Sequence, residues 1–142
     1  MLFVPTRTDR HRSDWDIPLF AGCTGRELRR IDRLGTSVTI DAGRVLFRRG
    51  AIGRQCFVIL EGEAAVDTVD GQVIVGRGAV IGELALLAPN GRNTATVTAV
   101  TGLDALVFTR TEFRQLMSSL PTVAHRILRE AAGRTVANGA AG

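Results

Sequence analysis

Hydrophobic and polar residues follow three patterns along the chain, which predict one helix, then a β-rich body, then two helices. Near the N-terminus, apolar residues recur at the spacing of one helix face, at Leu28, Ile31 and Leu34. Thr24 and Glu27 form the T-x-x-E pattern of a capping box, in which both side chains satisfy exposed backbone donors. Gly35 follows the last apolar residue, so we expect a short helix over Gly25–Leu34.

Residues 36–109 carry short runs of β-branched and apolar residues that alternate with glycine-containing turns, a pattern typical of strands. We expect seven strands, at Ser37–Ile40, Val45–Arg48, Cys56–Leu60, Ala64–Val69, Gln72–Val75, Thr94–Val100 and Asp104–Thr109. Asp70-Gly71 lies between two of them and predicts a two-residue hairpin turn, because both residues tolerate positive φ. No helical stretch long enough for a crossover separates the strands, which favours an antiparallel sandwich or barrel over a parallel sheet.

Helical spacing returns after the strands. Thr109 and Glu112 form a second capping box, and apolar residues follow on one face, at Phe113, Leu116, Met117 and Leu120. Pro121 ends this helix and suits the first turn of the next, whose apolar stripe ends near Val136. Three parts are therefore expected: a flexible arm at 1–14, one domain at 15–136 and a frayed tail at 137–142.

The composition is that of an ordinary globular domain with a small positive charge. Of the 142 residues, 18 are basic, all of them arginine, and 14 are acidic, which gives a net charge of +4. The arginines occur in runs no longer than two, and Phe supplies six aromatic residues beside one Trp. A base-stacking platform is hard to build from this set, so we expect no nucleic-acid partner. No apolar run reaches the ~18 residues of a membrane span, so we expect no membrane contact.

Residues with catalytic or metal-binding chemistry are sparse. The two cysteines, Cys23 and Cys56, make no disulfide framework and favour a reduced, cytoplasmic protein. The two histidines, His11 and His125, have no further partner at metal-ligand spacing, so we expect no metal and no cofactor. No nucleophile, base and orienting group fall together along the chain, and we therefore expect no enzyme activity.

One segment, Gly82–Val97, interrupts the strand pattern and carries the candidate chemistry. A glycine followed by a single helical turn exposes several backbone N–H groups in one direction, and such a start attracts anions. Arg92 offers a guanidinium for phosphate, and Glu83 offers a carboxylate for a hydroxyl. The segment thus predicts a pocket for a ligand with a phosphate and a sugar hydroxyl. The alternative is structural: Glu83 caps the turn, Arg92 is solvated and Asn93 is a turn residue.

A family resemblance is carried by Gly82-Glu83-Leu84-Ala85-Leu86, a following arginine and Thr94-Ala95-Thr96-Val97. These residues resemble the phosphate-binding cassette of the cyclic nucleotide-binding domain family, which includes the catabolite activator protein and the regulatory subunit of protein kinase A. The resemblance extends from about Ile17 to about Thr135, through Phe20, Gly43, Leu46, Phe47, Gly50, Gly53, Phe57, Ile59, Leu60, Glu61, Gly62, Gly78, Thr111, Glu112 and Phe113. It implies an antiparallel, jelly-roll-like β-roll of about eight strands, with an N-terminal helix and two C-terminal helices.

The resemblance also implies roles for single residues. Glu83 is expected to bind the ribose 2′-hydroxyl, and Thr94 to contribute an amide or a hydroxyl. Backbone contacts to the ligand are expected from Gly82, Leu84 and Ala85. In the family the last helix covers the base and can mediate dimerisation, so the expected lid residues are Val123, Ile127 and Leu128.

The position of the phosphate-binding arginine departs from the family pattern. Counting forward from Glu83 in the shorter cassettes selects Arg92, whereas counting back from Ala95-Thr96-Val97 selects Asn93. An asparagine there removes one charge-assisted contact worth about 1.5–3 kcal/mol, or roughly 10- to 100-fold in affinity. Because Pro89-Asn90-Gly91 makes the loop adaptable, Arg92 and Asn93 both remain candidate ligand-binding residues.

Two functions fit these observations. The first is a non-catalytic sensor that binds a cyclic nucleotide, cAMP in preference to cGMP, and relays binding through its C-terminal helices. The ~20 residues after Pro121 are too few for a helix-turn-helix output domain, so we expect a separate protein partner or a homodimer through the C-terminal helix. The alternative is a protein-interaction module whose degenerate cassette no longer binds nucleotide, an interpretation motivated by Asn93 and by the missing output domain.

Overall fold

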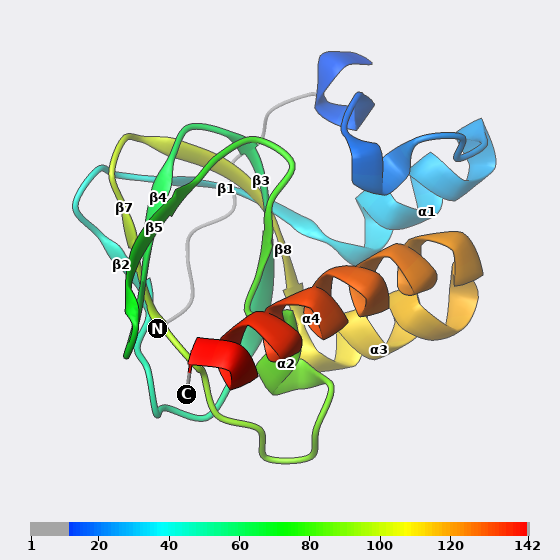
Figure 1. The fold of residues 1–142 in the computed structure, drawn as a ribbon. Helices are drawn as coiled ribbons and strands as arrows, with labels where there is room; N and C mark the ends of the chain where they lie inside the picture. Colours follow the sequence, from blue (N-terminus) through cyan, green and yellow to red (C-terminus); the bar gives the residue numbers. More distant parts are fainter. Residues whose placement is uncertain (1–11, 142) are drawn as a thin grey trace.

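Eight antiparallel strands form two four-stranded sheets that curl into a β-roll in the computed structural model of the chain (Figure 1). The structure describes residues 12–141, with side chains for residues 14–131. The strands are β1 (Thr36–Ile40), β2 (Val45–Phe47), β3 (Gln55–Glu61), β4 (Ala64–Thr68), β5 (Gly71–Val75), β6 (Val80–Ile81), β7 (Thr96–Ala99) and β8 (Leu103–Thr109). The sheets have the orders β1-β8-β3-β6 and β2-β7-β4-β5. This architecture confirms the predicted antiparallel β-roll.

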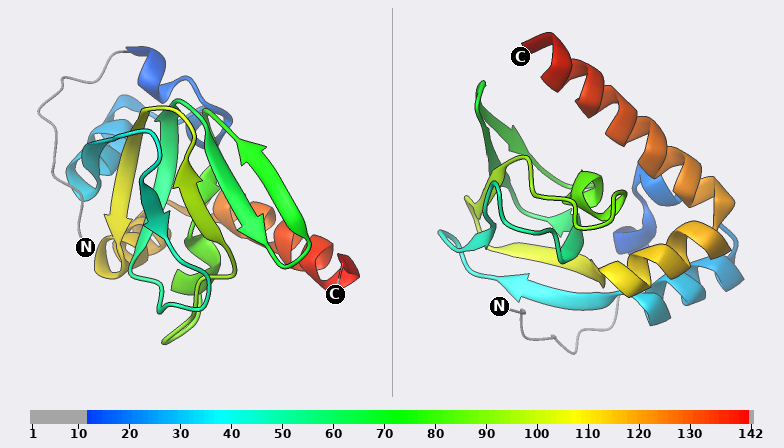
Figure 2. Two further views of the ribbon diagram at one scale, coloured as in Figure 1. Left: turned by 90° about the vertical axis from the view of Figure 1, so that its left-hand side faces the viewer. Right: turned by 90° about the horizontal axis from the view of Figure 1, so that it is seen from below.

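The central strands of the first sheet are buried on both faces. Along β3, one hydrophobic cluster contains Cys56, Val58 and Leu60, and a second cluster contains Phe57 and Ile59. Side chains alternate between the two faces of a strand, so this sheet separates the roll interior from the core beneath the helices (Figure 2). Burial on both faces explains why β3 reads as a continuous apolar run rather than as an alternating one.

Helices cover the outer face of this sheet (Figure 2). They are η1 (Arg12–Trp15), η2 (Pro18–Phe20), α1 (Gly25–Leu34), α2 (Glu83–Leu86), α3 (Arg110–Ser119) and α4 (Pro121–Ala141), the first two being 3₁₀ turns. Both predicted capping boxes are present. The Thr24 hydroxyl accepts from the backbone N–H of Glu27 at 3.1 Å, and the Glu27 carboxylate accepts from the N–H of Thr24 at 2.8 Å. Thr109 and Glu112 exchange the same two bonds at the start of α3.

The ends of the chain differ in part from the expectation. The last helix continues to Ala141 instead of ending near Val136, because alanines favour a helix and each internal glycine costs only about 1 kcal/mol. Most of the expected arm at 1–14, including His11, lies outside the described residues, as does Gly142 of the expected tail.

The predicted hairpin between β4 and β5 is confirmed, but its turn lies one residue earlier. Thr68 pairs with Gly71, so Val69 and Asp70 form the loop, and Gly71 opens β5 with a φ of 131°. The Thr68 hydroxyl accepts from the N–H of Asp70 and donates to the carbonyl of Gly71, both at 3.2 Å. These two local hydrogen bonds favour a turn at Val69 and Asp70. The pairing of the two strands does not by itself specify the position of this turn.

Two strands differ from the prediction by more than one residue at an end. The strand β6 spans only two residues, too few for alternation to mark it in the sequence. The strand β7 begins at Thr96 instead of Thr94, because the backbone before it pairs with the loop between β2 and β3. In that pairing the N–H of Asn93 donates to the carbonyl of Ala51 at 2.8 Å.

Candidate functional site

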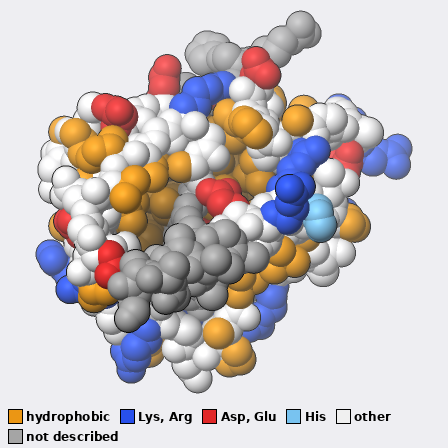
Figure 3. All heavy atoms as spheres, viewed as in Figure 1, with side chains coloured by type: hydrophobic (Ala, Val, Ile, Leu, Met, Phe, Trp, Pro, Cys, Tyr) orange, Lys and Arg blue, Asp and Glu red, His pale blue; other side chains and the backbone are white. Residues whose placement is uncertain are grey.

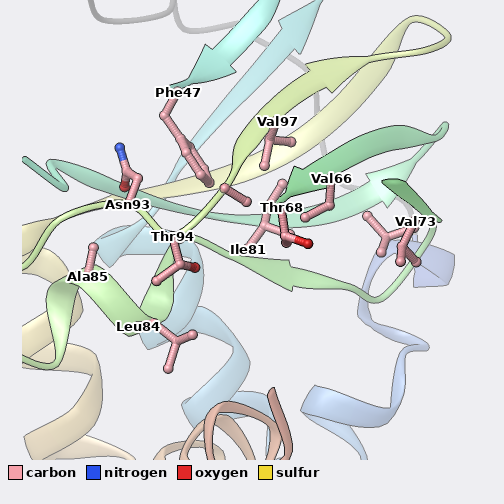
Figure 4. Close-up of a pocket in the computed structure, with 13 residues that line it drawn as sticks. Phe47, Val66, Thr68, Val73, Ile81, Leu84, Ala85, Asn93, Thr94 and Val97 are labelled. Atoms are coloured by element: carbon pink, nitrogen blue, oxygen red, sulfur yellow. The ribbon is translucent and has the colours of Figure 1, made fainter. Parts of the chain in front are cut away.

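A cavity of about 210 Å³ lies at one end of the roll, beside α2 (Figure 4). Its walls are mostly aliphatic or aromatic side chains, from Phe47, Val66, Val73, Val75, Ile81, Leu84 and Val97. Polar side chains on the wall come from Thr68, Asn93 and Thr94. Figure 3 shows hydrophobic side chains gathered around a hollow on this side of the molecule. The strands supply an apolar wall with one polar side chain, that of Thr68, and the segment before β7 supplies the other two polar side chains.

Gly82 shapes the floor of the cavity, because it turns the chain from β6 into α2. Its φ of 90° lies in the left-handed region, and a Cβ here would lie 2.7 Å from the carbonyl oxygen of Gln55. Glycine alone meets both constraints without strain. The next residue, Glu83, is the first of α2, and its side chain is fully buried, with 0% exposed.

We expect Gly82→Ala to lower the free energy of unfolding by about 2 kcal/mol, because alanine brings left-handed strain and a clash with a backbone oxygen. Urea unfolding measures this loss. The matched control is Gly76→Ala, where φ is not positive and a Cβ would make an ordinary contact of 3.6 Å with Gly62. That control should change stability by no more than about 0.5 kcal/mol. Equal losses in both variants would contradict the role given to Gly82.

Arg110, in the first turn of α3, holds the loops behind the cavity floor. Its guanidinium donates to the backbone carbonyls of Gly53 at 2.8 Å, Ala88 at 2.9 Å and Ala85 at 3.2 Å. The backbones are packed closely there, since a Cβ on Gly53 would lie 2.3 Å from the Cβ of Ala85. Arg110 was not among the predicted site residues, because its local pattern does not distinguish it from the other helical arginines.

The side chain of Asn93, and not that of Arg92, lines the cavity. Asn93 is 6% exposed, and its Nδ2 donates to the backbone carbonyl of Arg48 at 3.1 Å. Its Oδ1 is buried and accepts no hydrogen bond from the described residues. Arg92 is exposed, and its guanidinium donates to the carbonyl of Gly50 at 2.8 Å, outside the cavity. Counting back from Ala95 therefore identifies the residue on the wall.

The family model of the cyclic nucleotide-binding domain matches residues 37–119, which is more than half of the chain. The chain belongs to this family. A cyclic nucleotide-gated potassium channel of Rhizobium etli is 36% identical over 118 residues, which cover 83% of this chain and 33% of the channel. The cAMP-dependent protein kinase regulatory subunit of Schizosaccharomyces pombe is 32% identical over 106 residues, which cover 73% of this chain and 26% of that protein. The chain spans about a third of the length of the bacterial potassium-channel proteins to which it is similar.

Solved structures agree with this assignment of the fold. The catabolite activator protein of Thermus thermophilus superposes with a TM-score of 0.73 at 25% identity, over 86% of this chain and 60% of that one. A protein from a cyclic-GMP-dependent signalling pathway of bacterial phytopathogenesis gives a TM-score of 0.68 at 30% identity, over 80% of this chain and 94% of that one.

Within this cyclic nucleotide-binding domain, the predicted binding residues fall into two groups. Five of them line the cavity: Gly82, Leu84, Ala85, Asn93 and Thr94. Glu83 is buried beside them without lining the cavity, and Arg92 lies outside it. Wall residues such as Val66 and Val73 were not predicted, because alternation marks which side chains face inward but not which of these border a cavity.

The expected lid residues of α4 do not border the cavity. Val123 and Ile127 are 0% and 1% exposed and belong to the core beneath the helices, whereas Leu128 is 47% exposed. On the same helix, the guanidinium of Arg126 donates to the backbone carbonyl of Leu19 at 2.9 Å. This bond holds α4 against η2.

Outside the cavity, titratable side chains are dispersed over the described residues. No group of three His, Cys, Asp or Glu side chains there could hold a metal ion. No helix in the described part of the chain combines the length and the apolarity needed to cross a membrane. Cys23 and Cys56 form no disulfide. Burial, with a smaller contribution from Glu27, raises the pKa of the Cys23 thiol and so disfavours its reactive thiolate.

Proposed function

We propose that this domain is a non-catalytic sensor that binds a cyclic nucleotide in the cavity beside α2, with cAMP preferred to cGMP. The observation that carries the proposal is the cavity, which is mostly apolar and is lined by five of the predicted binding residues. Apolar walls with a few convergent polar groups are typical of small-molecule sites. The family model and the printed names of the relatives add the ligand class, a cyclic nucleotide.

The preference for adenine rests on the wall that faces the cassette. The side chains of Val66, Val73 and Val75 offer no hydrogen bonds to a base, and the Thr68 hydroxyl is already bonded to the β4–β5 turn. Guanine has more polar groups along its edge than adenine, and a polar group buried without a partner costs about 1–3 kcal/mol. An aliphatic wall therefore favours the less polar base.

In this proposal the cassette binds the sugar and α4 transmits the signal. Glu83 accepts a hydrogen bond from the ribose 2′-hydroxyl, while Gly82, Leu84 and Ala85 contact the ligand through their backbone and Thr94 does so through its amide or hydroxyl. The helix α4 contacts α2 and α3, so a change at the cavity floor reaches it directly. Movement of α4 away from η2 has to break the bond between Arg126 and Leu19. The lid residues Val123, Ile127 and Leu128 would then change their contacts.

The output of the sensor is a contact with a separate protein or with a second copy of the domain, through the C-terminal helices. We propose no contact with nucleic acid or membrane. A cytoplasmic location is part of the proposal, and the lack of a disulfide between Cys23 and Cys56 agrees with a reducing compartment.

Isothermal titration calorimetry tests the proposal. We expect cAMP to bind with a dissociation constant below about 1 mM and cGMP to bind at least about threefold more weakly. The control is Thr94→Trp, because Thr94 is exposed at the cavity wall and a bulky ring there should block binding without unfolding the domain. Absence of binding heat at millimolar nucleotide, or equal binding by the control, would contradict the sensor.

The rival function is a protein-interaction module with a degenerate cassette, and one observation favours it. Asn93 occupies the place on the cavity wall where the family pattern has an arginine. Its side-chain amide donates to the backbone carbonyl of Arg48. A partner captured equally with and without cAMP, by the wild type and by Thr94→Trp, would support the module. Capture that depends strictly on cAMP would exclude it.

A further inference from the structure

We propose that a hollow between α1 and the end of α3 binds an acidic segment of a partner protein through a row of four arginines. The inference rests on the proposed function in one respect, since it takes the output of the domain to be a protein contact. It adds the surface and the chemistry of that partner. The hollow, called the α1 hollow below, has a volume of about 460 Å³ and shares no described lining residue with the cavity beside α2. It lies where α1 contacts α3 (Figure 2).

The four arginines share one face of α1. They are Arg26, Arg29, Arg30 and Arg33, and all of them border the α1 hollow. Their spacing of three, four and seven residues from the first places them along one side of a helix. All four side chains are exposed, whereas the apolar side of α1 packs into the core beneath the helices. The arginine row therefore faces solvent and is accessible to a partner.

The charges of this row repel one another in the isolated domain. Arg26 and Arg30 are four residues apart, as are Arg29 and Arg33, and like charges at this spacing destabilise a helix. Glu27 is the one acidic side chain among the described residues that line the α1 hollow, and its carboxylate already accepts a backbone N–H in the capping box. A ligand with several carboxylates would relieve the repulsion. The α1 hollow is thus complementary to an acidic segment.

A hydrogen bond to α3 fixes part of this surface. The guanidinium of Arg30 donates to the hydroxyl oxygen of Ser119 at 3.1 Å, and Ser119 and Leu120 form the side of the α1 hollow that faces the arginine row. Less conformational entropy is lost on binding when a side chain is already held in place. A guanidinium has five N–H donors and binds a carboxylate through two parallel hydrogen bonds, so Arg30 keeps donors for a partner.

An acidic protein segment fits this surface better than a nucleic acid or a membrane. No aromatic side chain is among the described residues that line the α1 hollow, so it offers no platform for base stacking. A helix that lies on a membrane inserts its apolar face, but that of α1 is packed in the core. The row from Arg26 to Arg33 spans about 10 Å of helix axis, which is the length of about three extended residues.

Fluorescence anisotropy on the full chain tests the inference, with labelled hexaglutamate as the probe and hexaglutamine as its uncharged counterpart. We expect hexaglutamate to bind at low salt with a dissociation constant below about 1 mM, and hexaglutamine to bind at least about tenfold more weakly. Salt at about 0.5 M should weaken the binding of hexaglutamate about tenfold or more, because exposed charges are screened.

Reversing two charges of the row should abolish this binding. The variant is Arg29→Glu combined with Arg33→Glu. The matched control is Arg49→Glu combined with Arg54→Glu, which changes the net charge by the same amount at two exposed arginines outside the α1 hollow. The control should bind hexaglutamate within about threefold of the wild type, beyond which a general effect of net charge would be responsible.

Each outcome supports or overturns the inference. Equal losses in the two double variants overturn it, as does equal binding of hexaglutamate and hexaglutamine by the wild type, which decides the matter even where a variant fails to fold. Tighter binding of a random DNA duplex or of phosphatidylserine vesicles than of hexaglutamate also overturns it, since the surface would then fit another class of partner. Calorimetry with cAMP keeps the two proposals apart, because no arginine of α1 lines the cavity. Binding of hexaglutamate without any binding of cAMP supports the inference and overturns the sensor.

Discussion

Replacing Phe108 with alanine is expected to lower the free energy of unfolding by about 3–5 kcal/mol. Phe108 lies in β8, pairs across the sheet with Cys56 and is fully buried in the core beneath the helices. Removing its ring leaves a cavity between the sheet and the helices, and the tight packing around Gly35 leaves little room for collapse, since a Cβ on Gly35 would already lie 3.0 Å from the ring.

Urea unfolding followed by circular dichroism measures the Phe108→Ala loss, and the melting temperature should fall by roughly 10 °C. The control is Val69→Ala, at a residue that is 78% exposed in the β4–β5 turn. Its stability should stay within about 0.5 kcal/mol of the wild type. A loss below about 1 kcal/mol in Phe108→Ala would mean that the first sheet and the helices do not share one core.

Glu83→Ala is expected to weaken the binding of cAMP by about 10- to 100-fold, which is the size of one charged hydrogen bond. In the proposed function the carboxylate binds the ribose, so adenosine should lose affinity by the same factor. Glu83→Gln removes the charge but keeps an acceptor, and its loss should be smaller. Calorimetry with cAMP and with adenosine measures the loss of affinity of each variant relative to the wild type.

The control for Glu83 is Glu61→Ala, at an exposed residue at the end of β3 and outside the cavity lining. It should bind both ligands like the wild type. Thermal unfolding of the same variants tests the structural alternative, in which Glu83 only caps α2. Lower stability of Glu83→Ala with unchanged affinity would favour that alternative and remove the residue from the binding site.

Local signals predicted most of the fold. The first helix begins and ends as expected, because Thr24, Glu27 and Gly35 act on neighbours three or four residues away. The seven expected strands are present for the same reason, since alternation and glycine turns are properties of short segments. The missed strand β6 has two residues, which is below the length at which a period can be recognised.

The candidate site depends on contacts that local patterns do not contain. Whether Arg92 or Asn93 lines the cavity is decided by backbone bonds to the loop between β2 and β3, more than 40 positions earlier in the chain. The three carbonyls bound by Arg110 are brought together by the β-roll topology. The resemblance of the cassette predicted which segment forms the floor, and the structure shows which of its residues line the cavity.

The Arg110 contacts also affect how the molecule opens. One guanidinium ties the carbonyls of Gly53, Ala85 and Ala88 to the first turn of α3. Partial opening of the cassette would have to give up all three charge-assisted bonds or carry the helix along. The cassette and the start of α3 consequently form one cooperative unit of local unfolding, although the residues that compose it are scattered over more than 50 positions of the sequence.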